Sequence, residues 1–326
     1  MVIPALNEEN LIQKTLDSLG KQRVKGFSVI VVDNGSVDMT KEIVLDYVTR
    51  SSFNLLLLEE DKKGVGYARD SGSKKAAELG ALYIAGTDAD TILPPDWVGS
   101  IYKGFETGDC DLLCGECDPL KNVKFGNDRV SFTLNARSVL FKKVKPYFRG
   151  ANFAITAEMF KEVGGFKQPL TKEAKPAPGE DGALEVDALR LGAKICPCLA
   201  TVYPHPRRYI SNLIKIADFN GSVHEGGVVT EVRNETDLER VIGQIPESSI
   251  DIFIDKVSVS FFNEFVVCVF NDPVLKSVYW ENSLRFLEPF GREEVERDLS
   301  SGADIDLLWK KYKNVLFENI RRSGNT

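Results

Sequence analysis

The segment ALYIAGTDAD, residues 81–90, is an apolar run that ends in two carboxylates one residue apart. Its first six residues have the length and composition of a buried strand, and the acids follow at its carboxyl end. SVIVVD at 28–33 repeats this pattern with a single acid, and further apolar runs lie at 1–4 and 54–59. These runs predict four buried strands in the first ninety residues.

The segments between these strands have the apolar spacing of amphipathic helices. We predict helices over 8–19 and 39–48, with Asp38 placed to cap the second, and a third helix that runs through Leu79 and stops at Gly80. Alternation of strand and helix is typical of a doubly wound α/β fold with right-handed crossovers. We therefore expect a mostly parallel sheet with helices on both faces.

The pattern is less regular from about residue 110 onward. The predicted elements there are a strand at 111–116, a helix at 129–144, a strand at 150–155, a short helix at 157–163, a loop rich in Pro and Lys at 166–179, and a helix at 180–192. After about residue 207 the chain turns mainly helical and acidic. We predict an α/β domain over 1–209 and a mainly helical extension over 210–326 that packs on it or mediates dimerisation.

Composition excludes some classes of protein and indicates a location. The net charge of −7 provides no basic field for nucleic acid. No window carries the roughly 18 uninterrupted apolar residues of a membrane span, because charges interrupt the nearest one, 250–270. The chain opens without a secretory signal, which predicts a cytoplasmic protein.

Cysteine usage agrees with that location. All six cysteines are expected to be thiols in a reducing compartment. Cys114 and Cys117 have a spacing that occurs in zinc sites, but no second matching pair accompanies them.

Polar residues gather where the predicted strands end. Asn7 follows the first strand, Asp33 ends the second, and Asp88 and Asp90 follow the fourth. In open α/β sheets, ligands bind beyond the carboxyl ends of the strands. The sequence therefore predicts a ligand site at this edge.

The pair Asp88 and Asp90, with Ala89 between them, suits a hard cation. Mg²⁺ is bound in proteins by one or two carboxylates together with substrate phosphates and water. The same acids in a solvated turn are the structural alternative, because Asp is common in turns.

The first two loops offer contacts to a nucleotide or caps for their own turns. Asp33, which is followed by Asn34, Gly35 and Ser36, would contact a base or ribose, or cap the next turn. Asn7 and Glu8 would do the same, or begin a helix as N-cap and first-turn acid.

Arg69 and Asp70 fall in the first turns of the third helix, after Gly64 and Gly66. A dinucleotide-binding loop would need a third glycine where Arg69 stands, so that interpretation is rejected. Arg69 is placed to reach a phosphate and Asp70 a sugar or ribose hydroxyl. The alternative is an exposed ion pair of little energetic value.

Two further groups are candidates. Asp181, in the pair Glu180–Asp181, opens a helix after the 166–179 loop and could serve as a general base, or the two acids could simply decorate a first turn. His205, beside Arg207, is a candidate third metal ligand or diphosphate contact, or a structural histidine.

Several motifs occur in one order along the chain. They are VIPALNEEN, VVDNGSVDMT, KKGVGYARDSG, GTDADTILPPDWV, GANFAI, VGGF and EDGALEVDALRLG. Over 1–205 this ordered set resembles glycosyltransferase family 2, the inverting nucleotide-sugar transferases of the GT-A fold. The resemblance implies a nucleotide pocket, a metal and diphosphate motif at Asp88 and Asp90, and Asp181 as the catalytic base. The residues implied to line the nucleotide pocket are Pro4, Ala5, Asn7, Glu8 and Asp33.

The resemblance also implies a reaction and its partners. The donor is a nucleotide-diphosphate sugar bound with Mg²⁺ or Mn²⁺, and the acceptor is a saccharide or a lipid-linked group, which allows peripheral contact with the inner membrane face. The Q-x-x-R-W motif of processive members is absent, so a single addition is expected. A retaining transferase and a non-catalytic sugar-nucleotide-binding protein are the alternatives. A pyrophosphorylase is disfavoured, because the first strand runs into ALNEEN and not into a glycine-rich segment.

Overall fold

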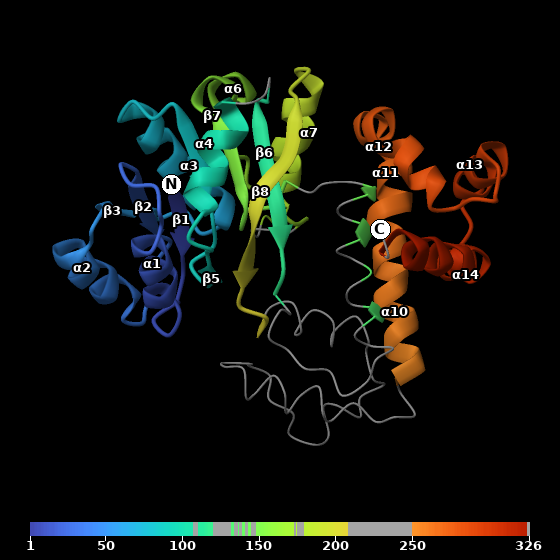
Figure 1. The fold of residues 1–326 in the computed structure, drawn as a ribbon, viewed down its shortest axis with the longest axis horizontal. Coiled ribbons are helices and arrows are strands. Elements are labelled where there is room, and N and C mark those ends of the chain that lie inside the picture. The colour runs from blue at the N-terminus through green and yellow to red at the C-terminus, as the bar shows by residue number, and fades with distance from the viewer. Residues whose placement is uncertain are drawn as a thin grey trace. The chain divides into compact units, whose positions relative to one another are not determined.

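The computed structural model describes residues 1–106, 110–119, 132–133, 136, 139–140, 143–144, 148–172, 174, 179–207 and 250–324. Contacts divide the chain into two compact units, Met1–Asp118 with Tyr147–His205, and Pro119–Pro146 with Pro206–Thr326. The first unit holds the sheet, and the described part of the second is helical (Figure 1).

Eight strands form one sheet in the order β3-β2-β1-β4-β7-β6-β8-β5. The strands are β1 Val2–Ala5, β2 Ser28–Asp33, β3 Asn54–Glu59, β4 Tyr83–Gly86, β5 Thr91–Ile92, β6 Leu112–Cys117, β7 Phe153–Thr156 and β8 Ile195–Pro204. Strands β1 to β4 are mutually parallel, β6 and β8 are parallel, and β7 runs antiparallel to both of its neighbours. The predicted α/β class with a mostly parallel sheet is confirmed.

Helices cover both faces of this sheet. The helices of the first unit are α1 Ile12–Gly20, α2 Thr40–Arg50, α3 Val65–Glu78, α4 Trp97–Glu106, α6 Ala157–Val163 and α7 Glu180–Arg190. One buried cluster packs α1, α2 and α4 on the sheet, and a second packs α3, α6 and α7 on the opposite face. Alternate residues of β1 enter different clusters, Ile3 the first and Val2 the second, as the period of a strand requires.

The strands predicted at 28–33 and 54–59 have those bounds, and the short helix at 157–163 is α6. Asp38 accepts hydrogen bonds from the backbone N–H groups of Thr40 and Glu9, although Met39 is the residue that precedes the helix. The helix predicted at 129–144 lies largely outside the described residues; among those described, Phe132 and Leu140 are helical and Val144 is in a turn.

Two strands were not predicted, and one cysteine prediction is wrong. Strand β8 lies beside β6 and also pairs with the two-residue β5. Its first residue faces Leu112, which brings Cys196 next to Cys110, with 6.0 Å between their Cα atoms, and the two form a disulfide. The expectation of six thiols therefore fails for this pair, because β8 and its register were not recognised.

The second unit is built from helices with an aromatic core. Its described helices are α10 Ile250–Phe262, which continues through a π-helical turn at Asn263–Val267 into α11 Cys268–Asn271, then α12 Pro273–Arg285, α13 Arg292–Ser300 and α14 Ile305–Gly324. One apolar face of this first helical stretch is buried, namely Val257, Phe261, Phe265 and Val269. The ring of Phe262 stacks on that of Tyr312 with centroids 5.9 Å apart.

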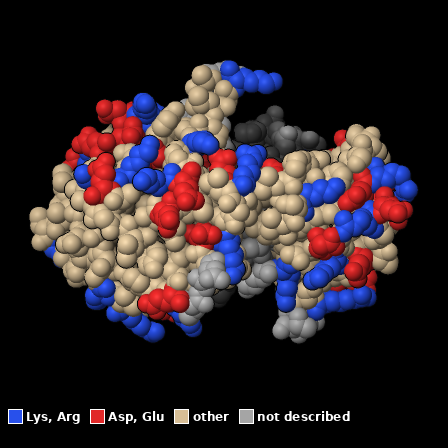
Figure 2. All heavy atoms as spheres, turned by 90° about the horizontal axis from the view of Figure 1, so that it is seen from above, with Lys and Arg blue, Asp and Glu red and all other residues tan. Residues whose placement is uncertain are grey.

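Charged side chains of both signs are interspersed on the face shown in Figure 2, in agreement with the absence of a global basic field. Within the described residues, no helix has the length and apolar character that crossing a membrane requires.

Candidate active site

The carboxyl ends of β1, β2 and β4 form one edge of the sheet, where most of the predicted site residues lie. Ala5 at the end of β1 pairs with Asp33 at the end of β2, and the chain leaves β4 at Gly86 to enter the acidic motif. The parallel direction of these strands brings together residues more than fifty positions apart in the sequence.

Arg69 is the centre of the site. Its side chain is 3% exposed, and it comes from the first turns of α3. The guanidinium donates from Nη2 to Oδ1 of Asp88 at 2.5 Å and from Nε to Oε1 of Glu180 at 3.1 Å. These partners lie 19 and 111 positions away in sequence. The alternative of an exposed ion pair is therefore wrong for Arg69.

The electrostatics of this cluster follow from burial and opposite charge. Burial opposes the charge on Arg69, but the carboxylates of Asp88, Glu180 and Asp181 outweigh it and raise the pKa of the guanidinium. Burial raises the pKa of Glu180, with Arg69 acting in the opposite direction. Nη1 of Arg69 is buried and has no hydrogen-bond partner among the described residues, so the N–H donors of this nitrogen are unused.

Gly150 packs directly on the guanidinium of Arg69. A Cβ built on this glycine would lie 2.6 Å from Cζ of Arg69, closer than any real contact. The N–H of Gly150 also donates to Oδ2 of Asp181 at 3.0 Å. The loop before β7 therefore contacts both Arg69 and Asp181, and it leaves no space for a side chain.

Gly150→Ala is expected to destabilise the protein by about 1–3 kcal/mol, because the added methyl group must displace a buried, ion-paired guanidinium. Gly20→Ala is the matched control. Its Cβ would make only an ordinary contact of 3.7 Å with the Tyr47 hydroxyl, so a change within about 0.5 kcal/mol is expected. Urea unfolding of both variants measures the difference, and equal midpoints would refute the close packing.

Glu180 and Asp181 begin α7 but have different surroundings. Glu180 is 6% exposed and is bound to Arg69. Asp181 is half-buried, and its two oxygens accept hydrogen bonds from the N–H groups of Gly150 and Gly182. The backbone therefore holds the Asp181 carboxylate in one orientation at the N-terminus of α7.

The acidic motif brings His205 close. Asp88 keeps 28% of its side chain exposed beside Arg69, whereas Ala89 and Asp90 are buried. The carbonyl of Ala89 accepts a hydrogen bond from the Thr15 hydroxyl, and the carbonyl of Asp90 accepts one from the N–H of His205, each at 2.8 Å. The pairing of β5 with β8 thus places the backbone of His205 beside that of Asp90.

A hard cation fits this donor set in part. No group of three or more His, Cys, Asp and Glu side chains within the described ranges is arranged to hold a metal. Two carboxylate residues one position apart meet the need of Mg²⁺ or Mn²⁺ when substrate phosphates and water complete the shell. The hydroxyls of Thr87 and Thr91, on either side of the motif, are buried without a partner in the described part of the chain.

The predicted nucleotide residues form two interlocked loops. Asn7 has a φ of 55°, and its side chain accepts from the N–H of Val37 at 2.9 Å. The carboxylate of Asp33 is 1% exposed and accepts from the N–H groups of Gly35 and Ser36 at 3.1 Å each. Asn7 and Asp33 therefore both bind backbone N–H groups of the loop after β2, as expected if their role is to stabilise these turns. Pro4 and Glu8 lie on the same edge, Glu8 almost completely buried.

Asp70 is the next residue on α3, but its carboxylate bonds to residues other than Arg69. Its Oδ1 accepts a hydrogen bond from the N–H of Phe166 at 3.0 Å, and its Oδ2 forms an ion pair with Lys74 at 2.6 Å. Through the bond to Phe166, Asp70 stabilises the turn at Gly164 and Gly165 that follows α6.

Three residues of this edge were not predicted. Asn34 donates to the carbonyls of Glu60 and Lys62 and accepts from the N–H of Gly64, each at 2.8 Å, so it fixes the loop that leads into α3 and Arg69. Its position after Asp33 is the only sequence signal for this role. Gly150 and Glu180 were also missed, because their importance lies in the contact with Arg69.

Comparison with known proteins places this geometry in a family. The family model described as "Glycosyl transferase family 2" matches residues 1–166. The chain belongs to glycosyl transferase family 2. The match includes β1 to β7, the acidic motif, Arg69 and Gly150, and it ends before Glu180 and Asp181.

Curated relatives of this family 2 chain match about a third of its length. Glycosyltransferase GlyA of Streptococcus pneumoniae is 28% identical over 115 residues, which is 35% of this chain and 16% of GlyA. Glycosyltransferase AglE of Haloferax volcanii is 34% identical over 120 residues, 36% of this chain and 38% of AglE. The chain thus matches less than half the length of either relative.

A solved structure has a fold similar to that of this family 2 chain. The crystal structure of S. aureus TarS 1-349 has a TM-score of 0.50 and 18% sequence identity, and it covers 99% of this chain and 88% of that one.

Proposed function

We propose that this chain is a metal-dependent inverting glycosyltransferase that moves a sugar from a nucleotide-diphosphate donor to an acceptor hydroxyl. The observation that carries the proposal is the contact of Arg69 with Asp88 and Glu180, beside Asp181. Acids from two distant segments meet at one buried guanidinium, at the edge of the sheet where α/β proteins bind ligands. Family membership supports the same reaction class.

The donor side of the site is assigned to the ends of β1, β2 and β4. The nucleoside would lie against the loops of Asn7 and Asp33, with Pro4, Ala5, Glu8 and Gly35 around them. Arg69 holds Asp88 in place, and its spare Nη1 donor suits a diphosphate oxygen. A divalent cation held by Asp88 and Asp90, with His205 nearby, would neutralise charge on the leaving diphosphate.

Asp181 is assigned as the general base. Its carboxylate accepts the proton of the acceptor hydroxyl as that oxygen attacks the anomeric carbon of the donor. The bond from the anomeric carbon to the diphosphate oxygen breaks at the same time, with its electron pair leaving on the nucleoside diphosphate. Attack from the face opposite the leaving group inverts the anomeric centre. Burial and pairing with Arg69 separate Glu180 from this task, because it is no longer accessible to an acceptor.

The acceptor is proposed to be a saccharide or a lipid-linked hydroxyl. We place the catalytic residues within 1–209 and assign 210–326 to support of that domain or to dimerisation. The acceptor would approach from the side of Asp181.

Release of nucleoside diphosphate from a panel of UDP-, GDP- and dTDP-sugars tests the proposal. With Mg²⁺ or Mn²⁺ present, one donor is expected to be turned over, and EDTA is expected to abolish the release. Asp88→Ala and Asp90→Ala should each lower the rate by at least about 10²-fold. Each substitution removes a carboxylate that would hold the cation, and that cation would stabilise the charge that develops on the leaving diphosphate.

Asp46→Ala is the matched control for these two variants. Asp46 is an exposed acid on α2 that is paired only with the exposed Arg50 in the contacts shown, and its loss should leave turnover unchanged. Metal-independent release at the wild-type rate in the Asp88 and Asp90 variants would refute the metal assignment. No release and no binding for any donor would refute the enzymatic assignment.

A further inference from the structure

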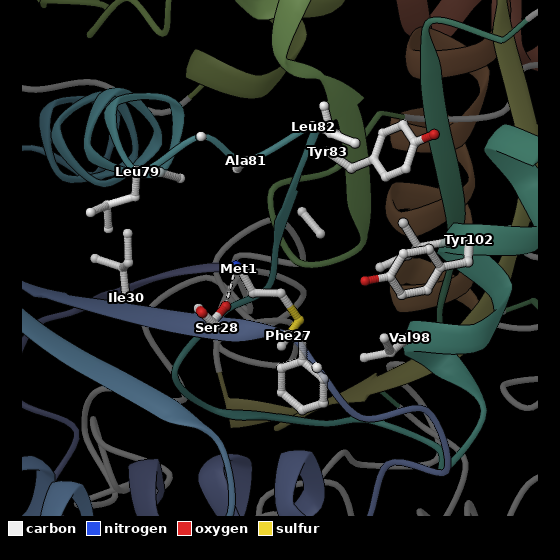
Figure 3. A pocket seen from close by; sticks show the side chains of 15 residues that line it. Met1, Phe27, Ser28, Ile30, Leu79, Ala81, Leu82, Tyr83, Val98 and Tyr102 are labelled. Atoms are coloured by element: carbon white, nitrogen blue, oxygen red, sulfur yellow. Dashed lines mark hydrogen bonds between the residues drawn. The ribbon is translucent and has the colours of Figure 1, made fainter.

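The two ends of α3 have different surroundings. Its carboxyl end borders a largely apolar cavity of about 320 Å³, which is lined there by Ala76, Leu79 and Gly80 (Figure 3). Its amino end follows the carboxyl end of β3, at the edge of the sheet that carries Arg69. The amino end of α3 is therefore the end that borders the proposed donor site.

The segment that follows α6 runs along one face of α3. The N–H of Phe166 donates to Oδ1 of Asp70 at 3.0 Å. Two residues further along the segment, the side-chain oxygen of Gln168 accepts a hydrogen bond from the N–H of Gly66 at 2.8 Å. Gly66 and Asp70 are four residues apart and so lie on the same face of the helix. The segment thus follows α3 to its first turn.

The bond to Gly66 caps α3 from a distant part of the chain. The first four N–H groups of a helix have no partner within the helix. No side chain at the N-cap position accepts from them, because that residue is Gly64. Gln168 provides an acceptor from 102 positions away in the sequence. Since Pro169 follows it, the backbone of Gln168 is biased towards an extended conformation, which suits a segment that lies along a helix.

The glycines at the start of α3 leave room for this contact. A Cβ built on Gly64 would lie 2.7 Å from Cδ of Gln168, and one built on Gly66 would lie 3.0 Å from its Cα. Gly64 also has a φ of 143°, which a residue with a side chain rarely adopts. The pattern Gly64-x-Gly66, rejected above as a dinucleotide-binding loop, is therefore explained by the space that it leaves for Gln168.

The loop over 60–64, which leads into α3, borders the residues assigned to the nucleoside. Asn34 makes three hydrogen bonds to this loop, each 2.8 Å long. Cε of Lys63 lies 3.9 Å from the position of a Cβ built on Gly35. The same loop is held by Gln168 where it enters α3. Its position beside Gly35 therefore depends on contacts at both of its sides.

We propose that Gln168 is a positioning residue for donor binding, because it fixes the loop 60–64 against the nucleoside side of the site. The role rests on the proposed transfer reaction. Without the side-chain oxygen of Gln168, the first turn of α3 loses its cap and the loop before it is free to move away from the nucleoside. The proposed base Asp181 is held by the N–H groups of Gly150 and Gly182, which this change leaves in place. Loss of the contact therefore weakens donor binding and spares the chemical step.

Gln168→Met tests this role, because methionine keeps the length of the side chain and removes the amide oxygen. KM and the dissociation constant for the donor that the release assay selects are expected to rise at least about fivefold, the scale of one lost hydrogen bond. The value of kcat should stay within about twofold of wild type. Gln168→Glu restores an acceptor oxygen, which the amino end of a helix favours as an anion, and should return donor affinity to within about twofold of wild type.

Lys167→Met is the matched control. Lys167 is the neighbouring residue on the same segment, and its exposed side chain forms an ion pair with Asp187 on α7. This variant should keep the wild-type KM and kcat. Initial-rate kinetics and calorimetry measure all three variants.

Hydrogen exchange at the amide of Gly66 reports the contact without reference to activity. In Gln168→Met this amide should exchange at least about tenfold faster, while amides of β2 keep their wild-type rates. Unchanged exchange at Gly66, an unchanged donor KM in Gln168→Met, no recovery in Gln168→Glu, or an equal loss in Lys167→Met would overturn the positioning role alone, as long as the wild type turns over its donor. A wild-type protein that turns over no donor would overturn the proposed function and this role with it, whatever the exchange at Gly66.

Discussion

Asp181→Asn is expected to lower the rate of sugar transfer by about 10²–10⁴-fold, the usual contribution of a general base. Asparagine has the shape of the carboxylate and still accepts a hydrogen bond from the N–H of Gly150, so the start of α7 should remain in place. It cannot take a proton from the acceptor. The donor should therefore bind with unchanged affinity, while kcat falls.

The measurement is initial-rate kinetics with the donor that the release assay selects, together with donor binding by calorimetry. Asp187→Asn is the matched control, because Asp187 lies on the same helix and forms exposed ion pairs with Lys167 and Arg190. It should retain wild-type kcat. Full activity in Asp181→Asn, or equal losses in both variants, would contradict the assignment of the base.

Arg69→Met is expected to destabilise the protein by about 3–5 kcal/mol, because it leaves Asp88 and Glu180 facing each other without the cation that neutralises both. Methionine keeps much of the volume, so the loss reports charge and hydrogen bonding more than a cavity. Transfer activity should be lost as well, since Asp88 would no longer be held in one position.

Chemical unfolding followed by circular dichroism measures this loss. Arg190→Met is the control. Arg190 is 59% exposed and paired with Asp187 three residues earlier, and such surface pairs contribute about 0–1 kcal/mol. If the two substitutions cost the same, Arg69 does not hold the site together.

The strands and helices of the first unit were predictable where a local run or spacing of apolar residues marks the element. Strand β2 has five consecutive buried residues after Ser28, and its bounds follow from its apolar run. Strand β8 was missed for the opposite reason. Only Leu199 and Val202 of its ten residues are buried, and Pro197 interrupts its pattern. Cys196 lies in β8 and His205 directly follows it. Because β8 was missed, the disulfide to Cys110 and the contact of His205 with Asp90 were missed as well.

The site could be predicted as a set of residue types at strand ends but not as a set of contacts. Periodicity shows which face of an element is buried, whereas the bond from Arg69 to Glu180 spans 111 residues and depends on the packing of α3 against α7. For the same reason Asp70 was grouped with Arg69 from sequence, although the structure directs it to the turn at Phe166.

The contacts of Arg69 also have a consequence for the order in which ligands arrive. One guanidinium stands against the carboxylates of Asp88, Glu180 and Asp181, so these acids outnumber the buried cation that they face. A diphosphate that approached alone would bring further negative charge to an edge that already has an excess. Under the proposed function, electroneutrality would therefore favour entry of the donor as a complex with a divalent cation, and after transfer the same excess of negative charge would help to expel a nucleoside diphosphate that had lost that cation.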